Sequence, residues 1–113
     1  TNMAAIGRKD KVDEVDSPHG TGDDCNDPDI YHTDEGSSDV FINGIGVVRE
    51  GDAMESHPKP GCVPHAPVLK SFSSQVYANG KRIGRIGDAY IGDGVHPIKT
   101  GSSNVFDGSP QTS

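Results

Sequence analysis

Five side chains that can bind a metal ion occur in the loops of this chain. His57, Cys62 and His65 lie within nine residues of one another, whereas His19 and His96 belong to two other loops. Imidazole nitrogen and thiolate sulfur are the ligands of structural zinc sites, which take four of them in a tetrahedron. The spacing of Cys62 and His65, with two residues between them, is more typical of a metal site than of a disulfide. We therefore predict one structural Zn²⁺, held by four of these five residues.

Two further candidates lie in the first loop. His32 is a single histidine among polar residues, so we expect it to be solvated. Cys25 is expected to be a free thiol or a weak disulfide partner rather than a ligand.

A sequence motif that occurs three times must position these loops. Its shared core is Ser-Ser-x-Val followed by an aromatic residue, and it occurs in residues 36–44, 72–80 and 101–108. Two copies continue into Arg-x-Gly-Asp, which ends at Asp52 and Asp88, and a degenerate copy ends at Asp10 without the preceding glycine. His19 lies nine residues after Asp10 and His96 lies eight after Asp88. These matching positions suggest that the two histidines point the same way.

Each copy has the pattern of a β-hairpin. Asn-Gly pairs at 43–44 and 79–80 favour tight turns, because both residue types tolerate positive φ. The strands that we expect are 40–42 and 45–49 in one hairpin and 76–78 and 81–86 in the other. No apolar pattern of period 3.6 has a useful length, so we expect essentially no helix.

The repeats predict an all-β fold in a single domain spanning 1–113. Its units are expected at about 4–44, 45–80 and 81–110. Hairpins that cannot bury their apolar faces alone should pack against one another. Because there are three copies and no fourth, we predict closure around a pseudo-threefold axis into a short pointed cone, with the zinc joining the loops at its point.

Composition explains why a metal is needed and excludes several functions. Only 31% of the 113 residues are hydrophobic, there is no tryptophan, and the 15 glycines and 8 prolines limit the core. Such a chain needs a metal, a disulfide or a partner for stability. The net charge of −7 and the scattered Lys and Arg argue against nucleic-acid binding. Without a nucleophile elbow or a phosphate-binding loop, we expect neither enzymatic activity nor a small-molecule substrate. No segment has the length and apolarity of a membrane-spanning helix.

The order of these features resembles the PAAR-repeat (proline-alanine-alanine-arginine) proteins, which form the tips of contractile injection machines. The resemblance covers about residues 4–110 and is most specific at 36–108. The family motif is kept as Arg-x-Gly-Asp within 46–52 and 81–88, without its proline.

The resemblance implies a β-structured cone whose point is closed by one zinc, commonly held by three histidines and one cysteine. It implies His19 as the ligand of the first loop, His57 and His65 as ligands of the middle loop, and His96 as that of the last. Cys62 stands beside His65 rather than in a loop of its own. Either Cys62 supplies the thiolate and one histidine is left out, or four histidines bind.

The resemblance also implies a partner, a location and a task. The broad base would sit on a trimeric β-helical spike, one chain per trimer, of the VgrG type in type VI secretion or the central spike of a phage tail. The tip would pierce the target outer membrane transiently. It would therefore be found in the virion or in the bacterial cytoplasm before injection, and be delivered to the target cell envelope.

Two alternatives concern the machine and the class of protein. Five residues follow the last repeat, so no fused toxin domain is expected and a phage tail is favoured over type VI secretion. The alternative function is a stand-alone zinc-stapled β-repeat scaffold or adhesion module of a secreted protein. Core and base would both be drawn from the apolar strand residues Val40, Phe41, Val76, Tyr77, Val105 and Phe106, without an assignment of which ones face the spike.

Overall fold

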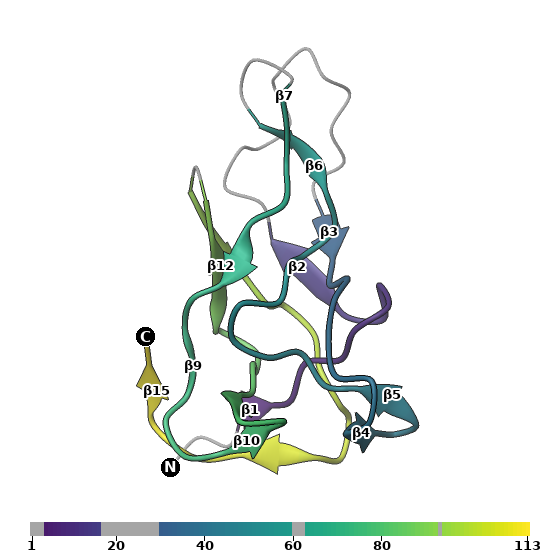
Figure 1. Cartoon of the computed structure of the whole chain (residues 1–113), viewed down its shortest axis with the longest axis vertical. Coiled ribbons are helices and arrows are strands. Elements are labelled where there is room, and N and C mark those ends of the chain that lie inside the picture. Colours follow the sequence, from purple (N-terminus) through teal and green to yellow (C-terminus); the bar gives the residue numbers. More distant parts are fainter. Residues whose placement is uncertain (1–3, 17–29, 60–62, 93) are drawn as a thin grey trace.

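The computed structural model describes residues 4–16, 30–59, 63–92 and 94–113. Within these residues the chain forms fifteen short β-strands and no helix (Figure 1), which confirms the all-β prediction. Accordingly, no apolar helix of membrane-spanning length occurs in the described part. The strands are β1 (Ala4–Ala5), β2 (Glu14–Asp16), β3 (Ile30–His32), β4 (Phe41–Ile42), β5 (Ile45–Gly46), β6 (His57–Lys59), β7 (Val63–His65), β8 (Val68–Leu69), β9 (Phe72–Ser73), β10 (Tyr77–Ala78), β11 (Lys81–Arg82), β12 (Ala89–Ile91), β13 (Val95–Pro97), β14 (Phe106–Asp107) and β15 (Gln111–Thr112).

Both predicted Asn-Gly hairpins form. Strand β4 pairs antiparallel with β5, and β10 pairs with β11 in the equivalent register. Asn43 and Gly44 have φ of 55° and 77°, and Asn79 and Gly80 have φ of 57° and 76°. A type I′ turn requires positive φ at both central residues, which explains the Asn-Gly sequence at both turns.

The second strand of each hairpin is shorter than predicted. We expected strands at 45–49 and 81–86, but β5 and β11 end at Gly46 and Arg82. The next residues pair with other segments: Val47 bridges to Arg8, and Ile83 bridges to Arg49. The backbone therefore leaves its hairpin partner after two residues and pairs with a neighbouring segment.

Some of the remaining ladders join segments that are distant in the sequence, and others join consecutive strands. Strand β1 pairs with β14, so that Ala5 lies opposite Phe106, and β15 pairs with β9. Strands β13, β12 and β8 form the one three-stranded sheet among the described residues, and β2 pairs with β3 and β6 with β7. Hairpins of consecutive strands and pairings between distant segments therefore both hold the fold together.

Three backbone hydrogen bonds join Gly7, Val48 and Gly84 into what we call the backbone ring. The amide of Gly7 donates to the carbonyl of Gly84 (2.9 Å), Gly84 donates to Val48 (3.0 Å), and Val48 donates to Gly7 (3.1 Å). A Cβ atom on Gly84 would lie 2.6 Å from Leu69 Cδ2, and one on Gly7 would lie 2.9 Å from Val48 Cγ2. Only the side chain of Val48 therefore fits at the backbone ring.

Two apolar clusters form the core. The larger one contains Val15, Tyr31, Val48, Met54, Leu69, Phe72, Tyr90 and Ile98. The smaller one contains Ile6, Val47, Ala78 and Ile83, with Ile42 and Val105 packed against it. The smaller cluster thus draws on residues in or beside β4, β10 and β14 and underlies these strands.

The molecule is longer than it is wide, with extents of 39, 27 and 24 Å. Figure 1 shows the β6–β7 hairpin at one narrow end and β1, β4, β5 and β10 at the opposite, broader end. The histidines of β6 and β7 are therefore far from the Asn-Gly hairpins.

Candidate metal centre

The hairpin at the narrow end places two predicted ligand positions opposite each other. In the β6–β7 pair, His57 is the Cα partner of His65, and Pro58 is the partner of Pro64. Directly opposed positions of an antiparallel pair lie on the same face of the ribbon. Proline is tolerated in both strands because each is an edge strand of this two-stranded ribbon. The middle loop thus positions His57 and His65 on one rung.

The structure brings His65 together with His96 of β13. Their ring centroids are 5.4 Å apart and the ring planes are inclined by 62°. His96 is fully buried, whereas His65 is partly exposed. Two predicted ligands from different loops therefore meet beside the narrow-end hairpin.

The environment of His96 determines which ring nitrogen can bind a metal. Its Nδ1 lies 3.2 Å from the carbonyl oxygen of Tyr90, its direct partner across the β12–β13 pair. Since a carbonyl only accepts, Nδ1 carries the proton, and the lone pair of the neutral ring is on Nε2. Metal-binding histidines usually donate their other ring N–H to a carbonyl or carboxylate in this way. His96 therefore fits the requirements of a zinc ligand through Nε2.

The other predicted ligands are not placed. His19 and Cys62 lie outside the described residues, as does Cys25, and of His57 only the backbone is described. Among the described side chains, no group of three or more His, Cys, Asp or Glu residues is arranged to hold a metal. That survey leaves out three of the five predicted ligands. The composition of the zinc site, including the choice between Cys62 and a fourth histidine, stays a prediction.

His32 has different surroundings. Its side chain is partly exposed, and Nδ1 lies 3.4 Å from Oε1 of Glu55, whose other oxygen is 3.7 Å from Nζ of Lys11. The partial exposure agrees with the expectation that His32 is solvated, and the contact with Glu55 adds a partner that the sequence did not indicate.

Three arginines each bind the aspartate of the following turn. In every pair the guanidinium and the arginine's own backbone amide donate to the same carboxylate. The Nε–Oδ2 distances are 3.0 Å for Arg8–Asp13, 2.9 Å for Arg49–Asp52 and 2.7 Å for Arg85–Asp88. Bonds to Asp13 and Asp52 raise the pKa of Arg8 and Arg49. An arginine–aspartate pair thus holds each of the three turns, and two of these pairs belong to the Arg-x-Gly-Asp motif.

The first of these pairs corrects the sequence interpretation. We expected the degenerate copy to end at Asp10, but Asp10 is exposed and Arg8 binds the buried Asp13. Asp10 and Lys11 have φ of 61° and 63°, so an extra turn separates the arginine from its acid. The matched spacing that related His19 to His96 was counted from Asp10 and does not hold from Asp13.

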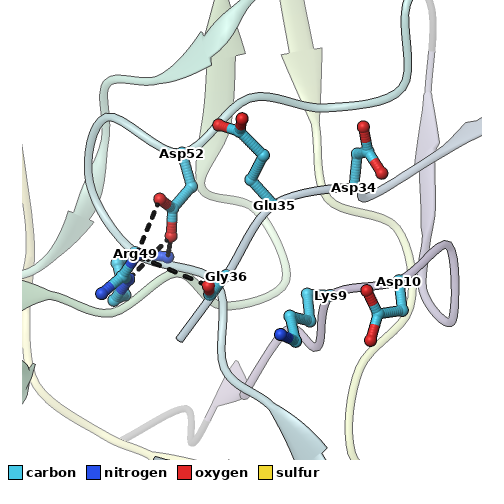
Figure 2. A pocket seen from close by; sticks show the side chains of 7 residues that line it. All are labelled: Lys9, Asp10, Asp34, Glu35, Gly36, Arg49 and Asp52. Atoms are coloured by element: carbon cyan, nitrogen blue, oxygen red, sulfur yellow. Dashed lines mark hydrogen bonds and ion pairs between the residues drawn. The ribbon is translucent and has the colours of Figure 1, made fainter. Parts of the chain in front are cut away.

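A hollow of about 440 Å³ is lined by none of the described histidines. Its walls are Lys9, Asp10, Asp34, Glu35, Gly36, Arg49 and Asp52. Figure 2 shows that Arg49 turns toward Asp52 and the carbonyl of Gly36 rather than into open space. Oε1 of Glu35 accepts the backbone amide of Ala53 at 2.8 Å. The hollow contains neither a described histidine nor a paired nucleophile and base, so we assign no chemistry to it.

The broad end exposes three aromatic side chains, which we call the aromatic base. They are Phe41 in β4, Tyr77 in β10 and Phe106 in β14, with 55%, 51% and 44% of their surface exposed. Next to them, Val40 and Val76 are partly exposed and Val105 packs on the smaller core cluster. The expectation that the core also draws on these six residues was wrong, because five of them are exposed and Val105 only packs against a core cluster.

No protein-family model matches this chain, and comparison with curated proteins found no match. The functional argument therefore depends on the residues and their geometry.

Proposed function

We propose that this chain is a PAAR-like tip that caps the trimeric β-helical spike of a contractile injection machine. The observation that carries the proposal is the placement of two kinds of surface at opposite ends of the molecule. The narrow end carries the β6–β7 hairpin with His65, and the broad end carries the aromatic base (Figure 1). A tip needs a stapled point at one end and an apolar docking surface at the other.

The internal bonding supports three equivalent units around an axis. The backbone ring takes one residue from each proposed unit, and each unit has one Arg–Asp pair. Serine amides repeat a further bond: Ser37 donates to Val47, Ser73 to Ile83 and Ser102 to Ile6, at 2.8 to 2.9 Å. A threefold arrangement of this kind would match the symmetry of a trimeric spike.

A single zinc would close the point of the cone. His65 and His96 would bind it together with two of His19, His57 and Cys62. When bound, the zinc supplies a cross-link between loops and no reaction. Such a cross-link favours resistance to mechanical unfolding, because a unit can peel away only after the metal bonds break.

The task follows from these parts. Sheath contraction would drive the tip through the target outer membrane, and the chain would travel in a phage virion or be loaded from the bacterial cytoplasm before injection.

Co-purification with a trimeric β-helical spike tests this function. We expect one chain per trimer, and we expect Phe41→Ser with Tyr77→Ser to abolish the complex while the melting curve stays unchanged. Ile91 in β12 and Val95 in β13 are similarly exposed apolar residues outside the aromatic base. The double variant Ile91→Ser with Val95→Ser is therefore the matched control and should leave binding intact. A zinc-loaded chain that shows no affinity for any such spike would instead support the scaffold or adhesion module.

A further inference from the structure

Asn43 and Asn79 are the two asparagines of this chain that precede a glycine. Both lie in exposed type I′ turns, and a side chain added at Gly44 or Gly80 would meet nothing within 4 Å. An Asn-Gly pair has an intrinsic chemistry, because glycine leaves the backbone amide open to attack the preceding side chain. We propose that Asn43 is a site of spontaneous deamidation and that hydrogen bonds protect Asn79 from the same reaction.

The reaction consumes one water and releases one ammonia. The backbone nitrogen of Gly44 loses its proton and bonds to Cγ of Asn43, and the Cγ–Nδ2 bond breaks as Nδ2 leaves as ammonia. Water then opens the five-membered imide at either carbonyl, which yields aspartate or isoaspartate. To reach its own backbone, the asparagine side chain must rotate away from its present partners.

Charged partners hold the side chain of Asn79. Its Nδ2 donates to Oδ1 of Asp39 at 2.6 Å, and its Oδ1 accepts from Ser37 Oγ at 2.6 Å and from Nη1 of Arg49 at 3.1 Å. A carboxylate only accepts and a guanidinium only donates, so the orientation of the amide is fixed. The bond from Asn79 is the largest cause that lowers the pKa of Asp39 from 3.8, so this partner is ionised.

Neutral partners hold the side chain of Asn43. Its Nδ2 donates to Oδ1 of Asn104 at 2.9 Å, and its Oδ1 accepts from Ser102 Oγ at 2.7 Å. An amide and a hydroxyl can each donate or accept. Asn43 can therefore turn over while its partners re-form their bonds, a freedom that Asn79 lacks.

The difference in partners sets the order of the two rates. Bonds to ionised groups are roughly twice as strong as neutral ones, and a difference of this size slows a reaction about tenfold when the bond must break first. Arg49 would accelerate the reaction at Asn79 if its guanidinium moved together with Oδ1 of Asn79, because it would stabilise the negative charge that forms on this oxygen during the attack. Two bonds to Asp52 and one to Gly36 hold its guanidinium in place, so restraint outweighs activation.

Ageing the purified full chain in mildly alkaline buffer, followed by peptide mapping with mass spectrometry, tests the proposal. We expect aspartate and isoaspartate at position 43 to appear about tenfold faster than at position 79. In denaturant the two rates should become equal, because both sites then have the same Asn-Gly chemistry. Equal rates in the folded chain, or a faster reaction at Asn79, would overturn the proposal.

Two matched variants at exposed positions exchange the charge of the side chain that each asparagine contacts. Asp39→Asn should accelerate the reaction at Asn79 and leave Asn43 unchanged, and Asn104→Asp should slow the reaction at Asn43. Rates that do not respond to either exchange contradict the hydrogen-bond explanation. The ratio of the deamidation rates at Asn43 and Asn79 in the wild-type chain, compared between the folded and the denatured state, tests the proposal even if a variant does not fold.

Discussion

Arg85 is the most enclosed of the three arginines that bind an aspartate. Its side chain is only 4% exposed and contacts two carboxylates, Oδ2 of Asp88 at 2.7 Å and Oδ2 of Asp107 at 3.2 Å. It also donates to the carbonyl of Ser109 at 2.8 Å. Arg85 thereby links the last part of the chain to the turn before β12. This link adds to the pairing of β14 with β1, two strands that no short turn connects.

The role of Asp107 can be tested through the pH dependence of stability. Although burial opposes the shift, bonds from Ser109 and Ser73 and the charge of Arg85 lower its pKa from 3.8. A carboxyl whose pKa is lower in the folded state stabilises the fold fully above pH 3.8, and this contribution disappears as the pH falls through the lower folded value. We expect Asp107→Asn to cost about 1–3 kcal/mol at neutral pH, and the difference from wild type to shrink in acid.

Urea unfolding of wild type and variant at neutral and acidic pH measures this difference. Asp34→Asn, at an exposed acid, is the control and should show little change at either pH. A cost for Asp107→Asn that stays constant with pH would contradict the assignment.

Sequence reasoning found the Arg-x-Gly-Asp motif but not all of its partners. The spacing of three residues in Arg49–Asp52 and Arg85–Asp88 is visible in the sequence, whereas Asp13 is displaced by a turn that nothing in the residue pattern marks. The carbonyl that orients His96 could not be found either, because backbone groups have no sequence signature.

At the scale of elements, the hairpins were predictable and their extent was not. Asn-Gly specifies the β4–β5 and β10–β11 turns locally through its tolerance of positive φ. The early end of β5 and β11 depends on bridges from Val47 to Arg8 and from Ile83 to Arg49, which join residues far apart in the chain. Pairings of that kind are decided by the packing of the whole domain.

The backbone ring allows a prediction about one residue. We expect Gly84→Ala to lower the free energy of unfolding by about 1–3 kcal/mol, because the new methyl group would meet Leu69 Cδ2 at 2.6 Å and Val48 Cγ2 at 3.0 Å. Gly92→Ala is the matched control, since its nearest contact would be Pro67 Cβ at 3.3 Å. Thermal or urea unfolding compares the two; a Gly84→Ala variant as stable as the wild type would show that the ring tolerates a side chain.

For the whole molecule, we expect the predicted zinc to determine whether the fold is stable. We expect one zinc per chain in protein purified without a metal-affinity step, and we expect a chelator to unfold it. Elemental analysis measures the first, and a content below about half an equivalent would contradict a structural zinc, whose binding is tight. Circular dichroism with added chelator measures the second.

Two histidine substitutions distinguish a zinc ligand from a histidine that does not bind the metal. If His65 binds the zinc, His65→Ala should cost several kcal/mol, about 3 or more, and reduce the zinc content. His32→Ala removes a solvated histidine that contacts Glu55 and should change neither quantity much. An unchanged melting curve for His65→Ala would exclude it as a ligand.

The single side chain at the backbone ring has a consequence for how such a fold can be encoded. Three identical chains around an axis would each present the same residue there, so the ring would hold three valines or none. The combination of Gly7, Val48 and Gly84 fills the space with one side chain. In the threefold arrangement that we propose, joining the units in one polypeptide would let each diverge, so that the axis is packed by an asymmetric choice that a homotrimer of the same hairpin cannot make.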